Sequence, residues 1–375
     1  MQYNHFTLLE NGKTAFPVIL DAIEKAEESL EINMFIWRDD EIGNRLAKTV
    51  LKTADRGVKV RLSVDKYGSV LEHLEESRKS FFHKKTNFSE NFKIWSLKTF
   101  YPEHRAKGKV RDEYSELYEK ILAHPNIELE KDIFKADHSK YYIIDGKKLF
   151  LGGINVEDKE LGKDKQEREY QDYMVELLGE EYVENFKAKW FGGENLSSEY
   201  YFDVNTKRVT PYRFEMEENY LSLIRNAKEE LTIIMPYFSP LKKFVEEIIL
   251  AVERGVRVRI MLPKRSNFQN DTNYKTAKIL SKKSKGKIAI YFTPKMAHTK
   301  LLMTENWVSF GSTNITMKAF NQLAELNLRV KNVEDSFVNS LKDSVEKHFL
   351  ISEKVTDYNQ IKYDRLKTAV EGLLV

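Results

Sequence analysis

Hydrophobic positions in the first 64 residues change between two periods. Apolar residues spaced three and four apart predict an amphipathic helix over Phe16–Ile23, and the apolar run Leu30–Trp37 predicts a strand. A second helical pattern, carried by Ile42 and Leu46 among others, ends near Gly57, and Val58–Val64 alternates as a strand. This succession of strand, helix and strand predicts a parallel sheet with right-handed crossovers.

The same pattern returns in the second half of the chain. The strand-like run Glu230–Phe238 precedes a predicted helix over Leu241–Val252 and another strand over Arg254–Pro263. The segments RGVKVRL from Arg56 and RGVRVRI from Arg254 form an internal repeat offset by 198 residues. We therefore predict an α/β protein of two similar halves, residues 1–205 and 206–375, joined through the Gly- and Ser-containing stretch 192–205.

A polar motif occurs once in each half, directly before an apolar run. The first copy reads HSKYYIID from His138 and continues to GGIN, which ends at Asn155. The second reads HTKLLMTE from His298 and continues to GSTN, which ends at Asn314. Residues two apart on a strand point to one face, so His138 and Lys140, like His298 and Lys300, should reach a common pocket.

This doubled set suits phosphoryl chemistry. One imidazole can attack phosphorus, while the other protonates the leaving alcohol and later deprotonates the incoming one. Two lysines and two asparagines would hold the non-bridging oxygens. A single His-x-Lys carries almost no information, and the duplication with similar spacing supplies the signal.

The two halves differ in length before the motif. The motif histidines are offset by 160 residues, whereas the strand repeat is offset by 198, so the first half has 38 additional residues between Asp65 and Asp137. Aromatic and basic residues alternate in this insertion, about residues 70–135. They are Phe81, Phe82, Phe88, Phe92, Trp95, Phe100 and Tyr101 with Lys84, Lys85, Lys93, Lys98, Arg105, Lys107, Lys109 and Arg111.

Three interpretations of the insertion remain open. Aromatic and cationic side chains together suit a lipid headgroup interface, so a peripheral membrane surface is one expected partner. The aromatics could instead pack the insertion onto the domain while the charges face water. Stacking on nucleic acid is the third interpretation.

Composition narrows the function classes. With 61 basic and 58 acidic residues the net charge is only +3, which does not indicate nucleic acid as a partner. The chain has no cysteine, and its eight histidines show no metal-ligand spacing, so we predict neither a metal nor another cofactor. No apolar window is long enough to span a membrane, so we expect a cytoplasmic protein, peripheral at the inner face of the membrane.

The paired motifs resemble those of the phospholipase D superfamily, HxKxxxxD in each half. Within it, the chain resembles the bacterial cardiolipin synthases over nearly its whole length. The matching segments are Asp40-x-x-Gly43, Arg56-Gly-Val, Asp65-x-x-Gly68-Ser69, Gly152-Gly-x-Asn155, Pro236-Tyr-Phe238 and Arg254-Gly-Val. The resemblance implies sheets that meet across a pseudo-two-fold axis, with the active site between the halves.

The resemblance also implies an acid for each histidine. Asp172, 34 residues after His138, and Glu325, 27 residues after His298, stand where the family carries acidic residues. We expect Asp172 to hold His138 as the nucleophile and Glu325 to hold His298 as the acid and base.

The motif acids Asp145 and Glu305 lie at the far end of the apolar strand, so we expect structural roles for them. The second motif has one residue fewer before its glycine, which leaves Thr304 as an alternative to Glu305 at the acid position. We expect Gly153 and Ser312 to be supporting residues of the site.

The resulting hypothesis is transfer of a phosphatidyl group, from a phosphatidylglycerol-like phospholipid, to an alcohol or to water through a phospho-histidine. A metal-independent nuclease of the same superfamily is the main alternative, and a non-catalytic binding protein is the third class. The residues do not distinguish water from alcohol as acceptor, and they indicate no oligomeric state.

Overall fold

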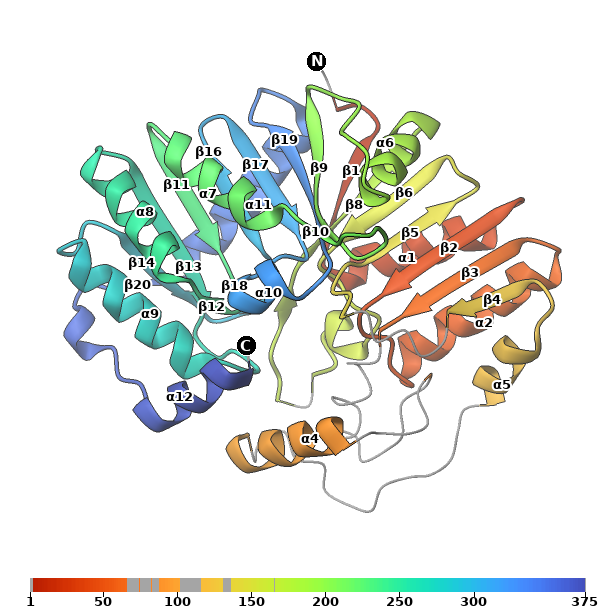
Figure 1. The fold of residues 1–375 in the computed structure, drawn as a ribbon, viewed down its shortest axis with the longest axis horizontal. Coiled ribbons are helices and arrows are strands. Elements are labelled where there is room, and N and C mark those ends of the chain that lie inside the picture. Colours follow the sequence, from red (N-terminus) through yellow and green to blue (C-terminus); the bar gives the residue numbers. More distant parts are fainter. Residues whose placement is uncertain are drawn as a thin grey trace.

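The computed structural model describes residues 3–65, 74, 82, 88–101, 116–130, 136–164 and 166–374. Two mixed α/β halves lie side by side, each built on one large sheet with helices on its outer face (Figure 1). The predicted α/β fold class of two similar halves is confirmed, but our prediction of mostly parallel sheets is wrong. Most neighbouring strands in both large sheets are antiparallel, because the strand after each motif histidine turns back through a short hairpin.

The first sheet has seven strands in the order β1-β8-β6-β5-β2-β3-β4. β2 and β3 are parallel, as predicted from their strand, helix, strand pattern, and β5 pairs antiparallel with β2. The strands are β1 (Phe6–Glu10), β2 (Ser29–Met34), β3 (Lys59–Val64), β4 (Ile127–Glu130), β5 (Tyr141–Ile144), β6 (Lys148–Gly152) and β8 (Tyr173–Leu178).

The second sheet repeats this order and adds a strand at each edge. Its order, β10-β9-β19-β17-β16-β11-β13-β14-β20, matches the first sheet strand by strand from β9 to β14. These strands are β9 (Tyr200–Thr206), β10 (Arg213–Phe214), β11 (Glu230–Ile234), β13 (Arg257–Pro263), β14 (Ala289–Thr293), β16 (Leu301–Thr304), β17 (Trp307–Gly311), β19 (Glu325–Lys331) and β20 (Glu353–Lys354). The sequence repeat is therefore a repeat of the fold. β9 includes residue 205, the predicted boundary between the halves, and pairs with β19. The division of the chain into units 1–205 and 206–375 remains a prediction.

Three large apolar cores stabilise the fold, and the central one joins the halves. Tyr142 and Ile144 of β5 face a core shared with the outer helices of the first half, whereas Tyr141 and Ile143 face a core between the sheets. This central core also contains Leu326 and other residues of the second sheet, so the halves share buried apolar surface. A third core lies between the second sheet and its own helices.

Helices cover both sheets and support their ends. Asp40 accepts a hydrogen bond from the amide of Gly43 at 3.0 Å and caps α2, and Gly57 ends that helix region with φ of +97°. The helices are α1 (Asn11–Glu24), α2 (Glu41–Asp55), α4 (Phe88–Phe100), α5 (Glu116–Ala123), α6 (Glu180–Trp190), α7 (Met216–Asn226), α8 (Lys242–Glu253), α9 (Asn270–Lys283), α10 (Met317–Asn321), α11 (Ser336–Leu350) and α12 (Arg365–Leu374), with short 3-10 turns η2 (Asp158–Leu161) and η3 (Tyr358–Gln360).

The described part of the insertion packs in two places. Phe82 is buried against Trp37, with ring centroids 5.1 Å apart. Tyr101, 2% exposed, donates a hydrogen bond from its hydroxyl to Glu371 at 2.8 Å and so ties the end of α4 to α12 of the second half.

The packing interpretation therefore holds for Phe82 and Tyr101. The predictions for Phe81, Lys84, Lys85, Arg105, Lys107, Lys109 and Arg111, and for the side chains of Phe88, Lys93 and Phe100, lie outside the described residues.

Candidate active site

Each histidine is fixed by backbone hydrogen bonds to the opposite half. The amide of His138 donates to the carbonyl of Ala324 at 2.8 Å, beside an isolated parallel bridge between Asp137 and Ala324. The amide of His298 donates to the carbonyl of Gln171 at 2.8 Å, where β15 (Met296–Ala297) pairs with β7 (Tyr170–Gln171). The two halves therefore exchange equivalent contacts at the motif histidines.

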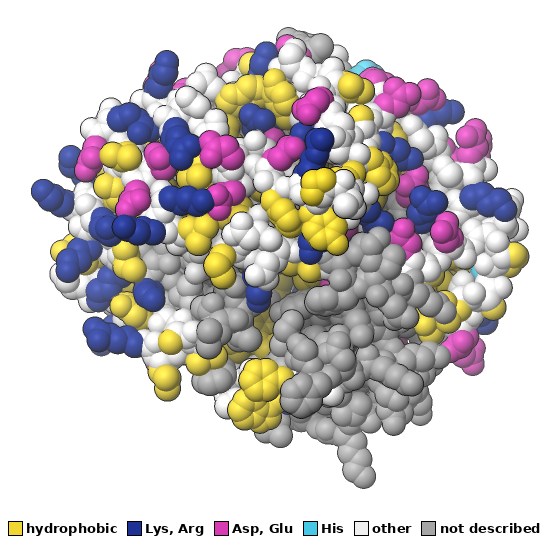
Figure 2. Space-filling model, in the orientation of Figure 1, with side chains coloured by type: hydrophobic (Ala, Val, Ile, Leu, Met, Phe, Trp, Pro, Cys, Tyr) yellow, Lys and Arg dark blue, Asp and Glu magenta, His cyan; other side chains and the backbone are white. Residues whose placement is uncertain are grey.

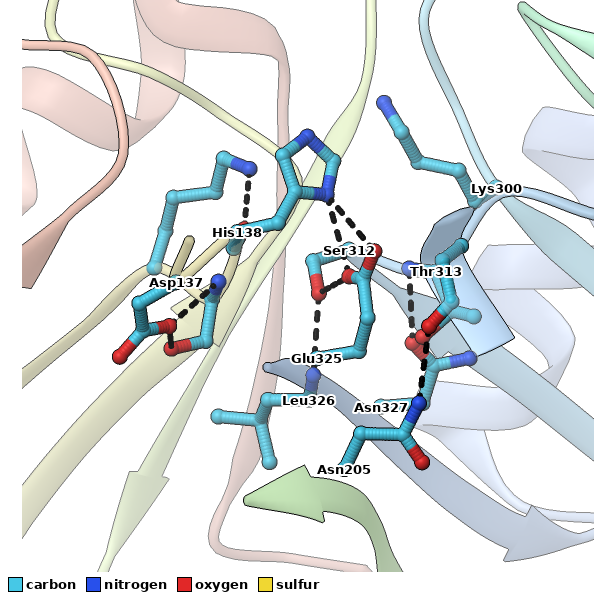
Figure 3. A network of polar contacts seen from close by, with 12 residues as sticks. Asp137, His138, Asn205, Lys300, Ser312, Thr313, Glu325, Leu326 and Asn327 are labelled. Carbon is cyan, nitrogen blue, oxygen red and sulfur yellow. Dashed lines mark hydrogen bonds and ion pairs between the residues drawn. The ribbon is translucent and has the colours of Figure 1, made fainter. Parts of the chain in front are cut away.

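These bridges determine which acid each imidazole meets. Nδ1 of His138 lies 3.0 Å from Oε2 of Glu325 (Figure 3), and Nδ1 of His298 lies 2.8 Å from Oδ2 of Asp172. Ala324 and Gln171 directly precede these acids, so each acid is delivered to the histidine of the other half. Our prediction that Asp172 holds His138 and Glu325 holds His298 is wrong, because the pairs cross between the halves.

Glu325 and Asp172 have different hydrogen-bond partners. The hydroxyl of Ser312 donates to Glu325, and the amide of Leu326 donates to that hydroxyl at 3.0 Å, as Figure 3 shows. Asp172 accepts from the amide of Tyr173 at 2.9 Å. A Cβ at Gly153 would lie 2.2 Å from Oδ2 of Asp172, so this position must lack a side chain. Gly153 and Ser312 thus act on the acids, in addition to preceding Asn155 and Asn314.

Both motif lysines are fully buried beside the histidines. Lys140 donates to the carbonyl of His138 and Lys300 to that of His298, and Nζ of Lys300 lies 3.7 Å from Oδ2 of Asp172. Burial, with the positive charge of Lys300 second, lowers the pKa of Lys140 to about 7. Burial likewise lowers the pKa of Lys300. An anion entering this site would favour the charged form of both amines.

Burial also sets the charge of the imidazoles. It lowers the pKa of His138 well below its ordinary value, with the charge of Lys140 as the second cause. Burial and then Lys300 lower the pKa of His298 to about 4, although the hydrogen bond from His298 to Asp172 opposes this shift. Burial raises the pKa of Glu325 to about 8. With a carboxyl at each Nδ1, Nε2 is the ring nitrogen left for chemistry.

His138, His298 and Asn155 line one cavity of about 110 Å³. One wall is largely apolar and includes Leu97 and Tyr101 from the insertion. Its members are Phe35, Ile36, Leu97, Tyr101 and Phe268. The rest of the lining is polar and consists of Arg38, Glu157, Lys159, Tyr170, Tyr237, Asn267 and Gln269. Lys140, Lys300 and Asn314 are buried but do not line the cavity.

The motif acids Asp145 and Glu305 lie in strand connections and have structural roles, as expected. Asp145 accepts hydrogen bonds from the amides of residues 27–29, which lead into β2. Glu305 accepts from the amides of residues 228–230, which lead into β11. Glu305 is thus the equivalent of Asp145. The missing residue falls in the turn after it, and Thr304 accepts hydrogen bonds from turn amides instead.

Sequence reasoning missed Glu160, which lies 3.9 Å from Nδ1 of His298 and is 1% exposed. The polar stretch around it gave no sign of burial. It also missed the polar wall, although Tyr237 belongs to a segment that carries the family resemblance. In the described part of the chain, no group of three or more His, Asp or Glu side chains is placed to hold a metal ion. No described helix has the length and apolar character needed to cross a membrane.

Two histidine and carboxylate pairs at the junction of duplicated α/β halves define the phospholipase D class of enzyme. The chain belongs to the family described as cardiolipin synthase, PLD-like domain, whose family model matches residues 19–190 and 220–349. The predicted superfamily is therefore confirmed, and the protein is an enzyme of this superfamily.

Relatives and solved structures agree with this placement. The chain is 24% identical over 388 residues to a cardiolipin synthase of Clostridium perfringens (strain 13 / Type A), covering 94% of this chain and 75% of the relative. It is 25% identical to cardiolipin synthase B of Salmonella typhi, covering 92% and 80%. The fold is similar to that of a phosphatidylserine synthase from Haemophilus influenzae Rd KW20, with a TM-score of 0.71 and 13% identity over 100% of this chain and 92% of that one.

Proposed function

We propose that the protein transfers a phosphatidyl group from a glycerophospholipid to a glycerol-type alcohol or to water. The observation that carries the proposal is a single cavity lined by two histidines, each with Nδ1 held by a buried carboxyl group. The naming of relatives as cardiolipin synthases supports a phospholipid substrate.

His138 acts as the nucleophile in this proposal. Its Nε2 forms a bond to phosphorus while the bond from phosphorus to the leaving alcohol breaks, and Nε2 of His298 gives its proton to the leaving oxygen. In the second step His298 takes the proton of the incoming alcohol or water, whose oxygen displaces His138 from phosphorus. Asn155 lines the cavity and holds a phosphoryl oxygen, and the charges of the buried Lys140 and Lys300, together with Asn314, stabilise the phosphoryl group electrostatically.

The division of labour follows from the surroundings of each ring. A nucleophile must be unprotonated, and burial beside Lys140 favours the neutral form of His138. The 2.8 Å contact between His298 and Asp172 favours imidazolium, which a general acid requires. The shortened second copy of the motif does not support this order, because Glu305 is the full equivalent of Asp145.

Trapping tests the roles of the histidines. With a 4-nitrophenyl phosphodiester, whose leaving group needs no proton, His298→Ala should accumulate phosphate on His138, because the base for the second step is absent. His138→Ala should form no covalent species. Phosphate on His298 in the His138→Ala variant, with His138 unmodified in the wild type, would reverse the assignment.

The substrate is tested by incubating purified protein with phosphatidylglycerol vesicles and analysing the lipids by mass spectrometry. New cardiolipin identifies an alcohol acceptor, and phosphatidic acid identifies water. No change in the lipids, together with cleavage of single-stranded DNA, would replace the proposal with the nuclease alternative.

We also propose that α4 contacts a lipid surface. Phe92 and Trp95 are 59% and 60% exposed, with ring centroids 5.8 Å apart, while Leu97 and Tyr101 line the cavity. Hydrophobic side chains are exposed at the lower edge of the molecule in Figure 2, where Figure 1 places α4. One helix thus joins an exposed aromatic pair to the apolar wall of the site.

Vesicle sedimentation tests this surface. Replacing Phe92 and Trp95 together with Ala should weaken binding to phosphatidylglycerol vesicles, because two exposed rings leave the interface. The matched control replaces Phe191 and Tyr212, exposed at 55% and 58% outside α4, with Ala. Equal binding by both double variants would exclude α4 as the contact.

A further inference from the structure

A third carboxyl group lies beside the His298 and Asp172 pair. Oε1 of Glu160 is 3.9 Å from Nδ1 of His298, whose nearer partner is Asp172 at 2.8 Å. Glu160 is 1% exposed, and in the described part of the chain its carboxyl oxygens have no side-chain hydrogen-bond partner, while the backbone amide of Asn155 interacts with them. A buried carboxyl group with so few partners is costly, so its retention beside a reacting histidine calls for a reason.

The turn that carries Glu160 is held firmly in place. Asp158 accepts a hydrogen bond from the amide of Ile42 at 2.9 Å, and its own amide donates to Asp40 at 2.7 Å. A Cβ at Gly12 would lie 2.7 Å from the backbone oxygen of Glu160, so α1 packs there without a side chain. The position of Glu160 is thus set by α1 and by the capped start of α2.

The charged groups around Glu160 come from three segments. Glu157 lies at the start of its own turn, Asp172 lies between β7 and β8, and His298 and Lys300 belong to the second motif. From α1, Gly12 contacts the backbone of Glu160, and the ammonium group of Lys13 lies near Gly162, which follows the turn. Burial, followed by the charges of Asp172 and Glu157, raises the pKa of Glu160 well above its ordinary value, and Lys300 opposes the shift. Burial therefore favours the protonated, uncharged form of Glu160.

We propose that Glu160 is a positioning residue that keeps a second proton available to His298, so that this imidazole can act as the general acid. The inference rests on the proposed phosphatidyl transfer. Glu160, Asp172 and His298 together hold two protons. One is on Nε2 of His298, and the other is shared between Nδ1 of His298 and the carboxyl group of Glu160. The total charge of the three residues is the same whether this shared proton is on Glu160 or on the imidazole.

The proton balance closes over the two steps. When the bond from phosphorus to the leaving oxygen breaks, the Nε2 proton moves to that oxygen, and the shared proton stays between Nδ1 and the carboxyl groups. The incoming alcohol then returns a proton to Nε2. Burial and Lys300 lower the pKa of His298 to about 4, so this imidazole needs a proton partner close by to act as an acid at neutral pH.

The test replaces Glu160 with Gln, which keeps the shape of the side chain but not the acidic proton. In the full-length protein, kcat/KM is measured against pH for phosphatidylglycerol and for a 4-nitrophenyl phosphodiester. We expect the high-pH limb for phosphatidylglycerol to move down by about one pH unit, and the ratio of the phospholipid rate to the aryl ester rate to fall about tenfold at pH 7.5. Glu160→Asp should recover part of this ratio, and Glu180→Gln, at an exposed glutamate, should not change it.

A purely structural role for Glu160 would lower both rates equally and leave the pH profile in place, and that result would overturn the inference. A second measurement does not depend on turnover. The pKa of His298, read from ¹⁵N imidazole shifts with inorganic phosphate bound, should fall in the Glu160→Gln protein, and an unchanged value would also overturn it. If the wild type cleaves the aryl ester but no phospholipid, the proposed function fails while this titration still tests Glu160.

Discussion

The crossed acid pairs predict that two conservative substitutions affect different chemical steps. Asp172→Asn removes the carboxylate from His298, and Glu325→Gln removes it from His138. If His298 is the acid and His138 the nucleophile, the first change should slow proton transfer and the second should slow attack on phosphorus. The opposite outcome would follow if each acid served the histidine of its own half.

The size of each effect follows from the contact that is lost. The Asp172 contact is a buried hydrogen bond of 2.8 Å to a ring that carries charge during the reaction. Hydrogen bonds to charged groups contribute about 1.5–3 kcal/mol. At about 1.36 kcal/mol per tenfold change in rate, we expect kcat for phosphatidylglycerol to fall by about 10- to 150-fold.

Pre-steady-state kinetics with a 4-nitrophenyl phosphodiester separates the two variants. In Asp172→Asn the burst of 4-nitrophenolate should persist, because this leaving group needs no proton, and only the slow phase should be reduced. In Glu325→Gln the burst itself should slow. Mass spectrometry of the trapped protein identifies the phosphorylated histidine and so separates a wrong pairing from reversed roles.

If Asp172→Asn loses the burst of 4-nitrophenolate while phosphate is found on His138, the functional importance of the crossed pairs is refuted. Phosphate on His298 instead would mean that His298 is the nucleophile, and the crossed pairing would still hold. Circular dichroism on both variants checks that each protein is folded.

Three further predictions concern the same site. Gly153→Ala places a Cβ 2.2 Å from Oδ2 of Asp172, so kcat should fall at least about tenfold in a folded protein, and a wild-type rate would contradict the crowding. Activity on phosphatidylglycerol should persist in excess EDTA, because lysines supply the positive charge, and a loss that added metal reverses would contradict this. Because burial lowers the pKa of Lys140 to about 7, kcat/KM should fall as pH rises through 7 and the ammonium is lost; a profile flat to pH 8.5 would exclude that role.

Local patterns in the sequence predicted the sheets well because alternation and helical spacing report which face of an element is buried. The parallel pairs β2-β3 and β11-β13 follow directly from the repeated segments at Arg56 and Arg254. The end of β2 was harder to predict. The apolar run continues to Trp37, but β2 ends at Met34, because Phe35 and Ile36 leave the sheet and line the cavity.

Contacts between distant segments were not predictable from order along the chain. Asp172 follows the first motif, so we predicted that it holds His138. The hydrogen bond from the amide of His138 to the carbonyl of Ala324, however, joins residues 186 positions apart and places Glu325 beside His138 instead. Tyr101 illustrates the same limit. Its place in an aromatic and basic stretch suited an interface, but its hydroxyl is bonded to Glu371 near the C-terminus. Composition cannot tell a ring that faces lipid from one that anchors a helix.

The crossing explains how a duplicated fold produces two chemically different histidines. Each half supplies one histidine and the acid for the other, so neither half alone contains a complete pair. A repeat with identical residues would give equivalent rings, whereas an attacking group and a proton donor need opposite charge states.

The two histidines differ in the surroundings of their acids, Glu325 and Asp172. Glu325 accepts a hydrogen bond from the hydroxyl of Ser312, and burial raises the pKa of its carboxyl group to about 8, which suits an uncharged His138. The Asp172 side has Gly153 in place of a serine, Lys300 at 3.7 Å and Glu160 behind the ring. Asp172 opposes the lowering of the His298 pKa by burial and Lys300, and Glu160 adds a second carboxyl group beside this ring. In our proposal, the surroundings rather than the motif itself therefore assign the nucleophile and the acid.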